Sequence, residues 1–261
     1  MCDIRSGQGM PKICVPIVET TQEKILEAAG ALCNSVADVV EWRADYYEDL
    51  QEPERLRETV ERLGQALGEK ALLFTIRTSQ EGGEKQISFE EYAVILEAVA
   101  EFSEISYIDV EMFWGARGKR GNIWSEADHS CHAPVRTLVA KLRRQVTVIG
   151  SYHDFEKTPP SAEITQRLTV MHELGADIPK MAVMPQKRED VLQLMMATWT
   201  ARQILDPVPV ITMSMGSMGA VSRVAGEAFG SAVTFGCVGK ASAPGQIEAD
   251  QLKQILEVLH A

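Results

Sequence analysis

Short apolar runs alternate with longer amphipathic segments from residue 13 to the end of this 261-residue chain. The runs have the length and the β-branched content of strands, and the segments between them carry apolar residues at helical spacing. The strand candidates are ICVPIV (13–18), VVEWRAD (39–45), ALLFTIR (71–77), YIDVEMF (107–113), VTVIGSYH (146–153), IPKMAVMP (178–185), VPVITMSM (208–215) and AVTFGCV (232–238). The helix candidates are 21–33, 52–67, 88–102, 133–145, 162–175, 188–205 and 246–261. Repeats of about 25 to 35 residues indicate an α/β fold with a single domain, a (β/α)8 TIM barrel, rather than an open sheet.

Within the strand candidates, apolar and polar residues alternate, so each strand has one apolar face and one polar face. Helices cover the outside of a barrel, so the apolar faces should point outward and the polar faces toward the axis. The charged residues that this assigns to the interior include Glu41, Arg43, Arg77, Asp109, Glu111, His153 and Lys180. Buried charges are unfavourable unless paired, and active sites of this fold lie at the carboxyl ends of the strands. The set therefore indicates a polar site rather than packing.

Lys180 and His153 are the two chemically informative members of this set. A desolvated lysine can carry a free amine at neutral pH, and such an amine attacks carbonyls to form a Schiff base. An imidazole that titrates near neutrality is well matched to removing a proton from the carbon next to an imine. Most lysines in apolar strands are edge residues or ion-paired, and most histidines are structural, so neither residue alone would establish a catalytic site.

Composition limits the possible partners and the compartment. Hydrophobic residues make up 45% of the chain and charged residues 24%, as in an ordinary globular protein, and the formal net charge is -11. With no basic patch, neither nucleic acid nor an anionic membrane is an expected partner, so an anionic substrate must be held by local arginines. No apolar stretch is long enough to span a bilayer and no signal core precedes the fold, so we expect a cytoplasmic protein.

The first residues of the chain and its cysteines each support one further expectation. Residues 1–11 are polar and contain glycine, so we expect a flexible N-terminal leader followed by the barrel catalytic domain at 12–261. The five cysteines are scattered, as expected of reduced thiols. The segment DHSCH (128–132) groups potential zinc ligands, but their spacing does not fit the common ligand pairs, so we expect a solvated loop and no metal site.

Eight motifs along the chain carry a family resemblance. In order, they are EWRAD, FTIRTSQEGGE, IDVE, GSYHDF, PKMAVMP, SMGSMGAVSR, FGSAVTFG and KASAPGQI. Over residues 12–261 the chain resembles type I 3-dehydroquinate dehydratase. The resemblance implies a lyase that converts 3-dehydroquinate to 3-dehydroshikimate and water, without cofactor or metal, as a homodimer. It places the enzyme in the shikimate pathway of aromatic amino-acid biosynthesis, although quinate breakdown uses the same chemical step.

The resemblance also implies the catalytic roles. The substrate ketone forms an imine with Lys180, and His153 acts first as the base and then as the acid that protonates the departing hydroxyl. Glu81, in the loop after the third strand, matches the acidic partner that orients this histidine. From residue type alone, Glu81 would be a solvated loop carboxylate.

Further matches concern substrate binding. Arg223 matches the arginine that binds the substrate carboxylate, for which a guanidinium supplies bidentate geometry. Glu41, Arg43 and Arg77 match residues that hold the ring hydroxyls, and a structural charge network is the alternative for each. Asp109 and Glu111 are expected to support the interior polar network. The remaining matches are Ser242 and Gln246 in a loop that closes over the substrate, and Met213, Met215 and Phe235 as apolar walls.

Two other functions compete with this interpretation. A class I aldolase also forms a Schiff base inside a barrel, but its usually phosphorylated substrates call for a glycine-rich phosphate site, which GAVSR does not resemble. A catalytically silent barrel could serve as a binding module. The chain has the complete set of Glu81, His153, Lys180 and Arg223, which argues against a silent barrel.

Overall fold

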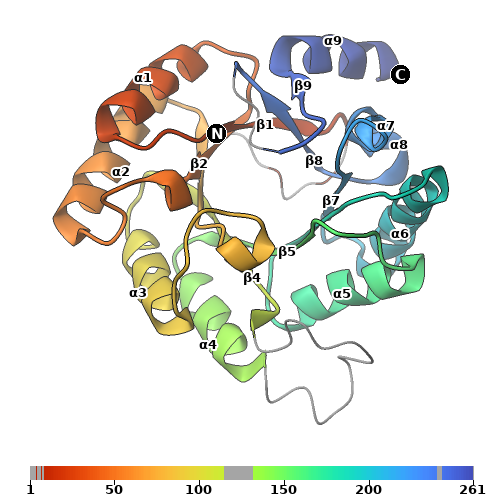
Figure 1. The fold of residues 1–261 in the computed structure, drawn as a ribbon, viewed down its shortest axis with the longest axis horizontal. Coiled ribbons are helices and arrows are strands. Elements are labelled where there is room, and N and C mark those ends of the chain that lie inside the picture. The colour runs from red at the N-terminus through yellow and green to blue at the C-terminus, as the bar shows by residue number, and fades with distance from the viewer. Residues whose placement is uncertain (1–3, 5–6, 8, 115–131, 240–242, 261) are drawn as a thin grey trace.

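The computed structural model describes residues 4, 7, 9–114, 132–239 and 243–260. In these residues, parallel strands curl around a common axis and helices form a ring outside them (Figure 1). The strands are β1 (Lys12–Ile17), β2 (Val39–Arg43), β3 (Ala71–Thr75), β4 (Ile105–Glu111), β5 (Thr147–Asp154), β6 (Ile178–Val183), β7 (Ile211–Ser214), β8 (Val233–Cys237) and the short β9 (Ile247–Glu248). Their order in the sheet is β7-β6-β5-β4-β3-β2-β1-β8-β9. A bridge between Val210 and Ser231 joins the β7 and β8 sides, which closes the barrel.

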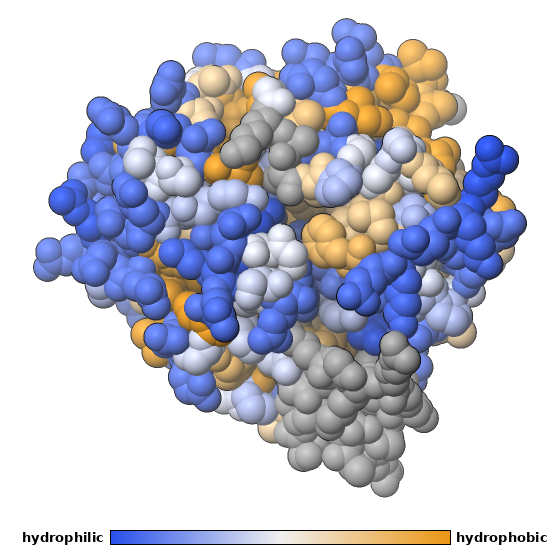
Figure 2. Space-filling view, viewed as in Figure 1, coloured by the Kyte–Doolittle hydropathy of each residue, from blue (hydrophilic) through white to orange (hydrophobic). Residues whose placement is uncertain are grey.

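The helices have the amphipathic pattern that this position requires. They are α1 (Gln22–Cys33), α2 (Pro53–Leu67), α3 (Phe89–Val99), α4 (Ala133–Leu142), α5 (Ser161–Glu173), α6 (Arg188–Leu205), α7 (Ala220–Val224), α8 (Gly226–Phe229) and α9 (Ala249–Leu259), with short 3₁₀ turns η2 (Ala44–Tyr46) and η3 (Ser79–Glu81). Leu56, Val60 and Leu63 bury one face of α2. Ser88 and Glu91 form a capping box at the start of α3, which satisfies backbone donors there. Figure 2 shows a mostly hydrophilic periphery, as expected of outward helix faces.

The barrel interior is layered. Inward residues near the amino ends of the strands, among them Val39, Leu73, Ile149 and Ile178, form an apolar cluster of their own. Two residues farther along the same strands come polar side chains such as Glu41, Thr75, Ser151 and Lys180, all buried. Since alternate residues of a strand share a face, the sequence sets both layers, and the polar layer lies toward the carboxyl ends.

The structure confirms the single-domain barrel and the eight predicted strands, with ends displaced by up to three residues. It also corrects the expectation for the last helix, because Ile247 and Glu248 pair with β8 as a strand and α9 begins at Ala249. Ile4, inside the expected leader, is 2% exposed and its backbone nitrogen donates to the Tyr107 hydroxyl. At this residue the chain is packed rather than loose; for most of residues 1–11 the flexible leader stays a prediction.

Candidate active site

Lys180 lies on β6 with its side chain inside the barrel, and the residue is 3% exposed. Its Nζ donates to Asp109 Oδ2 at 3.0 Å and lies 3.8 Å from Glu41 Oε1. The ring of Phe235 is 4.7 Å from the same nitrogen. The amino group of Lys180 is thus held between two carboxylates and an aromatic face.

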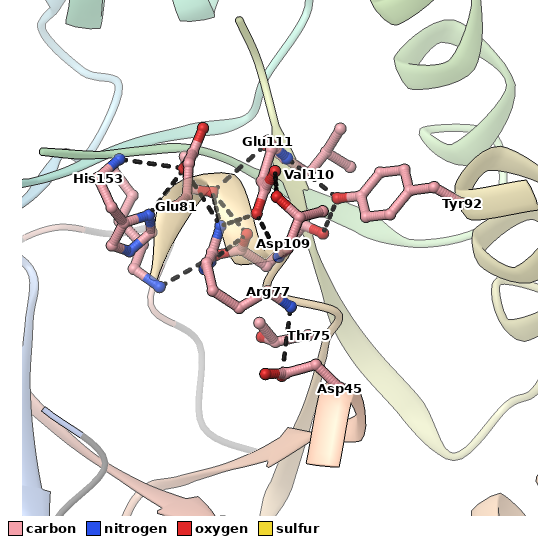
Figure 3. Close-up of polar contacts among 12 residues, drawn as sticks. Asp45, Thr75, Arg77, Glu81, Tyr92, Asp109, Val110, Glu111 and His153 are labelled. Atoms are coloured by element: carbon pink, nitrogen blue, oxygen red, sulfur yellow. Dashed lines mark hydrogen bonds and ion pairs between the residues drawn. The ribbon is translucent and has the colours of Figure 1, made fainter. Parts of the chain in front are cut away.

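Arg77 organises the polar layer around this lysine. Its guanidinium contacts Asp109 at 2.7 Å, Ser151 at 3.0 Å and Glu111 at 3.2 Å, as Figure 3 shows for both carboxylates. Burial by itself would raise the pKa of Asp109, but the charges of Arg77 and Lys180 outweigh it and hold that pKa well below its ordinary value. Asp109 is therefore a permanent anion beside Lys180.

His153 lies on β5 and is oriented by a carboxylate, Glu81 of η3. Glu81 Oε2 is 3.0 Å from His153 Nδ1 and also accepts the backbone N–H of His153 at 3.1 Å (Figure 3). An ionised carboxylate only accepts hydrogen bonds, so the neutral imidazole carries its proton on Nδ1 and keeps Nε2 as the acceptor. Burial lowers the pKa of His153 well below its ordinary value, and the positive charges of Arg77 and Lys180 lower it further. The ring is therefore a neutral base.

The loop that carries Glu81 requires the two glycines of EGGE. Gly82 has φ +79°, and a Cβ on it would lie 2.4 Å from the Phe155 ring. A Cβ on Gly83 would lie 2.0 Å from the backbone oxygen of Arg77. The ring of Phe155 in turn stacks on His153, with centroids 6.4 Å apart and an interplanar angle of 23°. A side chain at either glycine would push apart the groups that place Glu81 and His153.

Arg223, on α7, is a buried guanidinium with an unusual set of partners. Its Nη1 donates to the Phe235 carbonyl at 3.3 Å and its Nη2 to the Pro244 carbonyl at 3.1 Å. Its Nε is buried and has no hydrogen-bond partner in the described part of the chain, and no carboxylate there forms an ion pair with it. Burial lowers its pKa from 12.5 to about 10. A buried cation without a carboxylate partner is unfavourable by itself, so Arg223 is a candidate for binding an anionic ligand.

These groups surround one cavity. The lining residues that the sequence predicted are Glu41, Arg43, Arg77, Glu81, His153, Lys180, Met213, Met215, Arg223, Phe235 and Gln246. Asp109 and Glu111 are fully buried among the side chains that form its floor, in the supporting position expected of them. Ser242 lies outside the described residues. The cavity therefore brings together the amino group of Lys180, the imidazole of His153 and the guanidinium of Arg223, which has no carboxylate partner among the described residues.

Comparison with known proteins identifies the family. The family model for type I 3-dehydroquinase matches residues 13–261. The chain belongs to the type I 3-dehydroquinase family. It is 47% identical over 257 residues to the 3-dehydroquinate dehydratase of Lactiplantibacillus plantarum, and the matched region covers 98% of this chain and 96% of the relative. The 3-dehydroquinate dehydratase of Bacillus subtilis is 42% identical, covering 97% of this chain and 94% of the relative.

Solved structures agree in fold. A type I 3-dehydroquinate dehydratase from Clostridium difficile, solved with covalently modified comenic acid, superposes with a TM-score of 0.87 at 41% identity, covering 97% of this chain and 94% of that one. The 3-dehydroquinate dehydratase from Enterococcus faecalis gives 0.84 at 36% identity, covering 98% and 97%. The sequence-based family assignment is confirmed, and the chain is an enzyme of the 3-dehydroquinate dehydratase class.

Sequence reasoning missed several residues of this type I 3-dehydroquinase cavity. Gly82, Phe155, Ala182 and Ala243 also line it. The strand period could have found two of them, because Phe155 and Ala182 follow His153 and Lys180 by two residues and so continue the inward face. Ala182 is small, which leaves room for a ring beyond the lysine. The other two lie in loops, where no period applies.

The expectation of a solvated DHSCH loop is wrong for His132. This residue is 3% exposed, and its ring packs edge-on against Phe113 with centroids 5.6 Å apart. Residues 128–131 lie outside the described part of the chain. Among the described residues, no group of three or more histidine, cysteine, aspartate or glutamate side chains could hold a metal ion, and no helix is long and apolar enough to cross a membrane.

Proposed function

We propose that this chain dehydrates 3-dehydroquinate to 3-dehydroshikimate through an imine on Lys180. The observation that carries the proposal is the content of one cavity: Lys180, the His153–Glu81 pair and Arg223, which has no carboxylate partner in the described part of the chain, all face it. A substrate with a ketone at one end and a carboxylate at the other matches these three features together. The type I 3-dehydroquinase relatives share the whole fold that assembles them.

In the proposed reaction, the ammonium group of Lys180 gives up a proton, its nitrogen adds to the carbon of the substrate ketone, and loss of the ketone oxygen as water leaves a cationic imine. This cation draws electrons from the neighbouring carbon, so a weak base can remove a proton there. Asp109 remains ionised 3.0 Å from the lysine nitrogen, so it stabilises the positive charge as it forms.

His153 is the proposed base, through Nε2. Glu81 holds the opposite ring nitrogen and stabilises the imidazolium that results. The same proton is then available to the departing hydroxyl as the carbon–oxygen bond breaks and the new double bond forms. Hydrolysis of the imine releases the product and restores Lys180.

Binding of the substrate is assigned to the groups that line the rest of the cavity. Arg223 would pair with the carboxylate, while Glu41 and Arg43 would hold ring hydroxyls, with Gln246 and Ser242 in the loop that covers them. Arg77 is predicted to contact a hydroxyl as well. Its guanidinium is already engaged by three carboxylates, so keeping the polar layer in place is a second part of its proposed role.

Borohydride trapping tests the proposal. Reduction converts an imine to a stable amine, so the intact protein incubated with 3-dehydroquinate and borohydride should gain one adduct, which peptide mapping should place on Lys180. Lys180→Ala should give neither adduct nor turnover. A folded protein with no adduct and no turnover on 3-dehydroquinate would return the choice to an aldolase-type carbonyl substrate or to a silent binding module.

The homodimer and the role in aromatic biosynthesis stay predictions of the resemblance, and the cytoplasmic location stays a prediction from the sequence. The outer face of α6 offers a surface on which to test the dimer, since Leu192, Met196 and Trp199 are 66%, 55% and 50% exposed at helical spacing. Met196→Glu should shift the mass in solution from a dimer to a monomer. If the wild-type chain is already monomeric, the prediction is wrong.

A further inference from the structure

Asp45 is a buried carboxylate just beyond the end of β2, in η2. It is 1% exposed. Its Oδ1 accepts from Arg43 Nε at 2.7 Å and from the backbone N–H of Arg77 at 3.2 Å. Its Oδ2 accepts from Arg43 Nη2 at 2.7 Å and from the backbone N–H of Glu84 at 3.1 Å. Each oxygen therefore binds one side-chain donor and one backbone donor.

The two backbone donors enclose the segment that carries Glu81. Arg77 precedes η3 and Glu84 follows it, so Asp45 fastens both ends of the loop at 77–84; Figure 3 shows it below the backbone nitrogen of Arg77. A second carboxylate fastens the same loop from another strand. Glu111 accepts from the backbone N–H of Thr78 at 2.8 Å and from its hydroxyl at 2.9 Å. Glu81 thus reaches His153 from a loop held by two fixed anions.

We propose that Asp45 is a positioning residue, which holds the Glu81 loop and Arg43 in register so that Glu81 orients His153. The inference rests on the proposed roles of Glu81 and His153. Backbone hydrogen bonds to an anion are stronger than those to a neutral acceptor, and a loop with two glycines needs such restraint to keep a carboxylate within hydrogen-bond distance of a ring nitrogen.

The chemistry of the site specifies aspartate. The acceptor positions of both oxygens are in use, and all four donors are N–H groups. Asparagine would keep one oxygen and turn an NH₂ group toward two of these donors. Asp45→Asn should therefore release one end of the loop while the size of the side chain is preserved.

A double-mutant cycle in steady-state kinetics with 3-dehydroquinate tests the role. Asp45→Asn should lower kcat by about 10- to 100-fold, the effect expected of a displacement near 1 Å in a catalytic group. Glu81→Ala removes the group that is to be positioned. In that background, Asp45→Asn should lower kcat by less than about threefold, whereas its effect on KM, exerted through Arg43, should persist. If the loss of kcat in the double variant equals the product of the losses in the two single variants, the proposal is overturned.

Asp177→Asn is the matched control. Asp177 also combines an arginine, with Arg143 Nε at 2.9 Å, and a backbone donor, with Val148 N at 2.9 Å, but it does not line the cavity. It should lose stability as Asp45→Asn does and keep kcat within about twofold. If Asp45→Asn does not fold, Asp45→Glu keeps the charge beside Arg43 and moves the carboxylate along by one methylene. A wild-type kcat in folded Asp45→Glu would also overturn the proposal.

The same experiment separates failure of the positioning role from failure of the proposed function. If Glu81→Ala alone retains the wild-type kcat, the assignment of Glu81 to His153 is wrong, and the role of Asp45 falls with it. If Glu81→Ala is impaired but the two substitutions act independently, the proposed function stands and only the positioning role of Asp45 is removed.

Discussion

Substitution by methionine should change the free energy of unfolding very differently at two buried arginines, Arg77 and Arg223. Burial lowers the pKa of Arg223 from 12.5 to about 10. At about 1.4 kcal/mol for each pKa unit, this shift corresponds to roughly 3 kcal/mol of desolvation cost for its charge. Its hydrogen bonds to two backbone carbonyls offset that cost by about 1.5 kcal/mol each. We therefore expect Arg223→Met to change the free energy of unfolding by no more than about 1 kcal/mol.

Arg77→Met is the matched substitution at a paired guanidinium. It leaves three buried carboxylates, Glu81, Asp109 and Glu111, without their shared cation. Removal of one partner from a buried ion pair typically costs about 3 to 5 kcal/mol, so this variant should be the far less stable of the two. Urea unfolding followed by tryptophan fluorescence measures both values under one set of conditions.

Arg223→Met should impair catalysis although it leaves the free energy of unfolding nearly unchanged. Loss of two charge-assisted hydrogen bonds to the substrate carboxylate costs about 3 kcal/mol, which raises KM for 3-dehydroquinate roughly 100-fold. Absorbance of the conjugated product gives kcat and KM together. If Arg223→Met lowers the free energy of unfolding as much as Arg77→Met does, Arg223 is structurally paired. An unchanged KM would remove it from the substrate site.

Four further predictions concern the base and its loop. His153→Ala should still form the borohydride-trapped imine while kcat falls by about 100-fold or more, and near-normal turnover would contradict the base assignment. Because burial and neighbouring cations hold the pKa of His153 well below 6.5, kcat/KM should stay level as pH falls through 6.5 and decline only below it; an acid limb above 6.5 would be inconsistent with that shift. The same depressed pKa means that the unfolded chain binds more protons there, so stability should decrease as pH falls below about 6.5. Gly82→Ala should displace Phe155 and lower kcat about tenfold or more, whereas Gly30→Ala on α1, where a Cβ meets nothing within 4 Å, should keep full activity and stabilise the fold.

The strand period explains which parts of this site could be predicted from sequence. Lys180, His153 and Glu41 lie within regular strands, where alternation alone fixes the face that a side chain occupies. Arg223 lies on the five-residue helix α7, which is too short for a periodic pattern, so only the family resemblance indicated its role. The two backbone contacts of Asp45 could not be predicted either. They join residues more than 30 positions apart through backbone donors of a loop, and such donors leave no mark on residue type.

The distribution of charge in the cavity explains how one enzyme could orient its substrate before any covalent bond forms. Around Lys180, Arg43 and Arg77, carboxylates balance every buried cation, so that side of the cavity offers no net attraction to an anion. Arg223 is the exception, because its guanidinium meets carbonyl oxygens and no carboxylate among the described residues. In the proposed function, the carboxylate of the substrate would therefore be drawn to the Arg223 side, and its uncharged ketone would be left to face Lys180. Asp109→Asn should weaken this polarity by removing the carboxylate nearest to Lys180, which leaves Glu41 at 3.8 Å as its remaining anion, and the variant should bind simple carboxylates in competition with substrate more tightly than the wild-type enzyme does. Equal inhibition of the two enzymes by a small carboxylate such as benzoate would show that the pairing of Lys180 and Arg77 does not control where the anion binds.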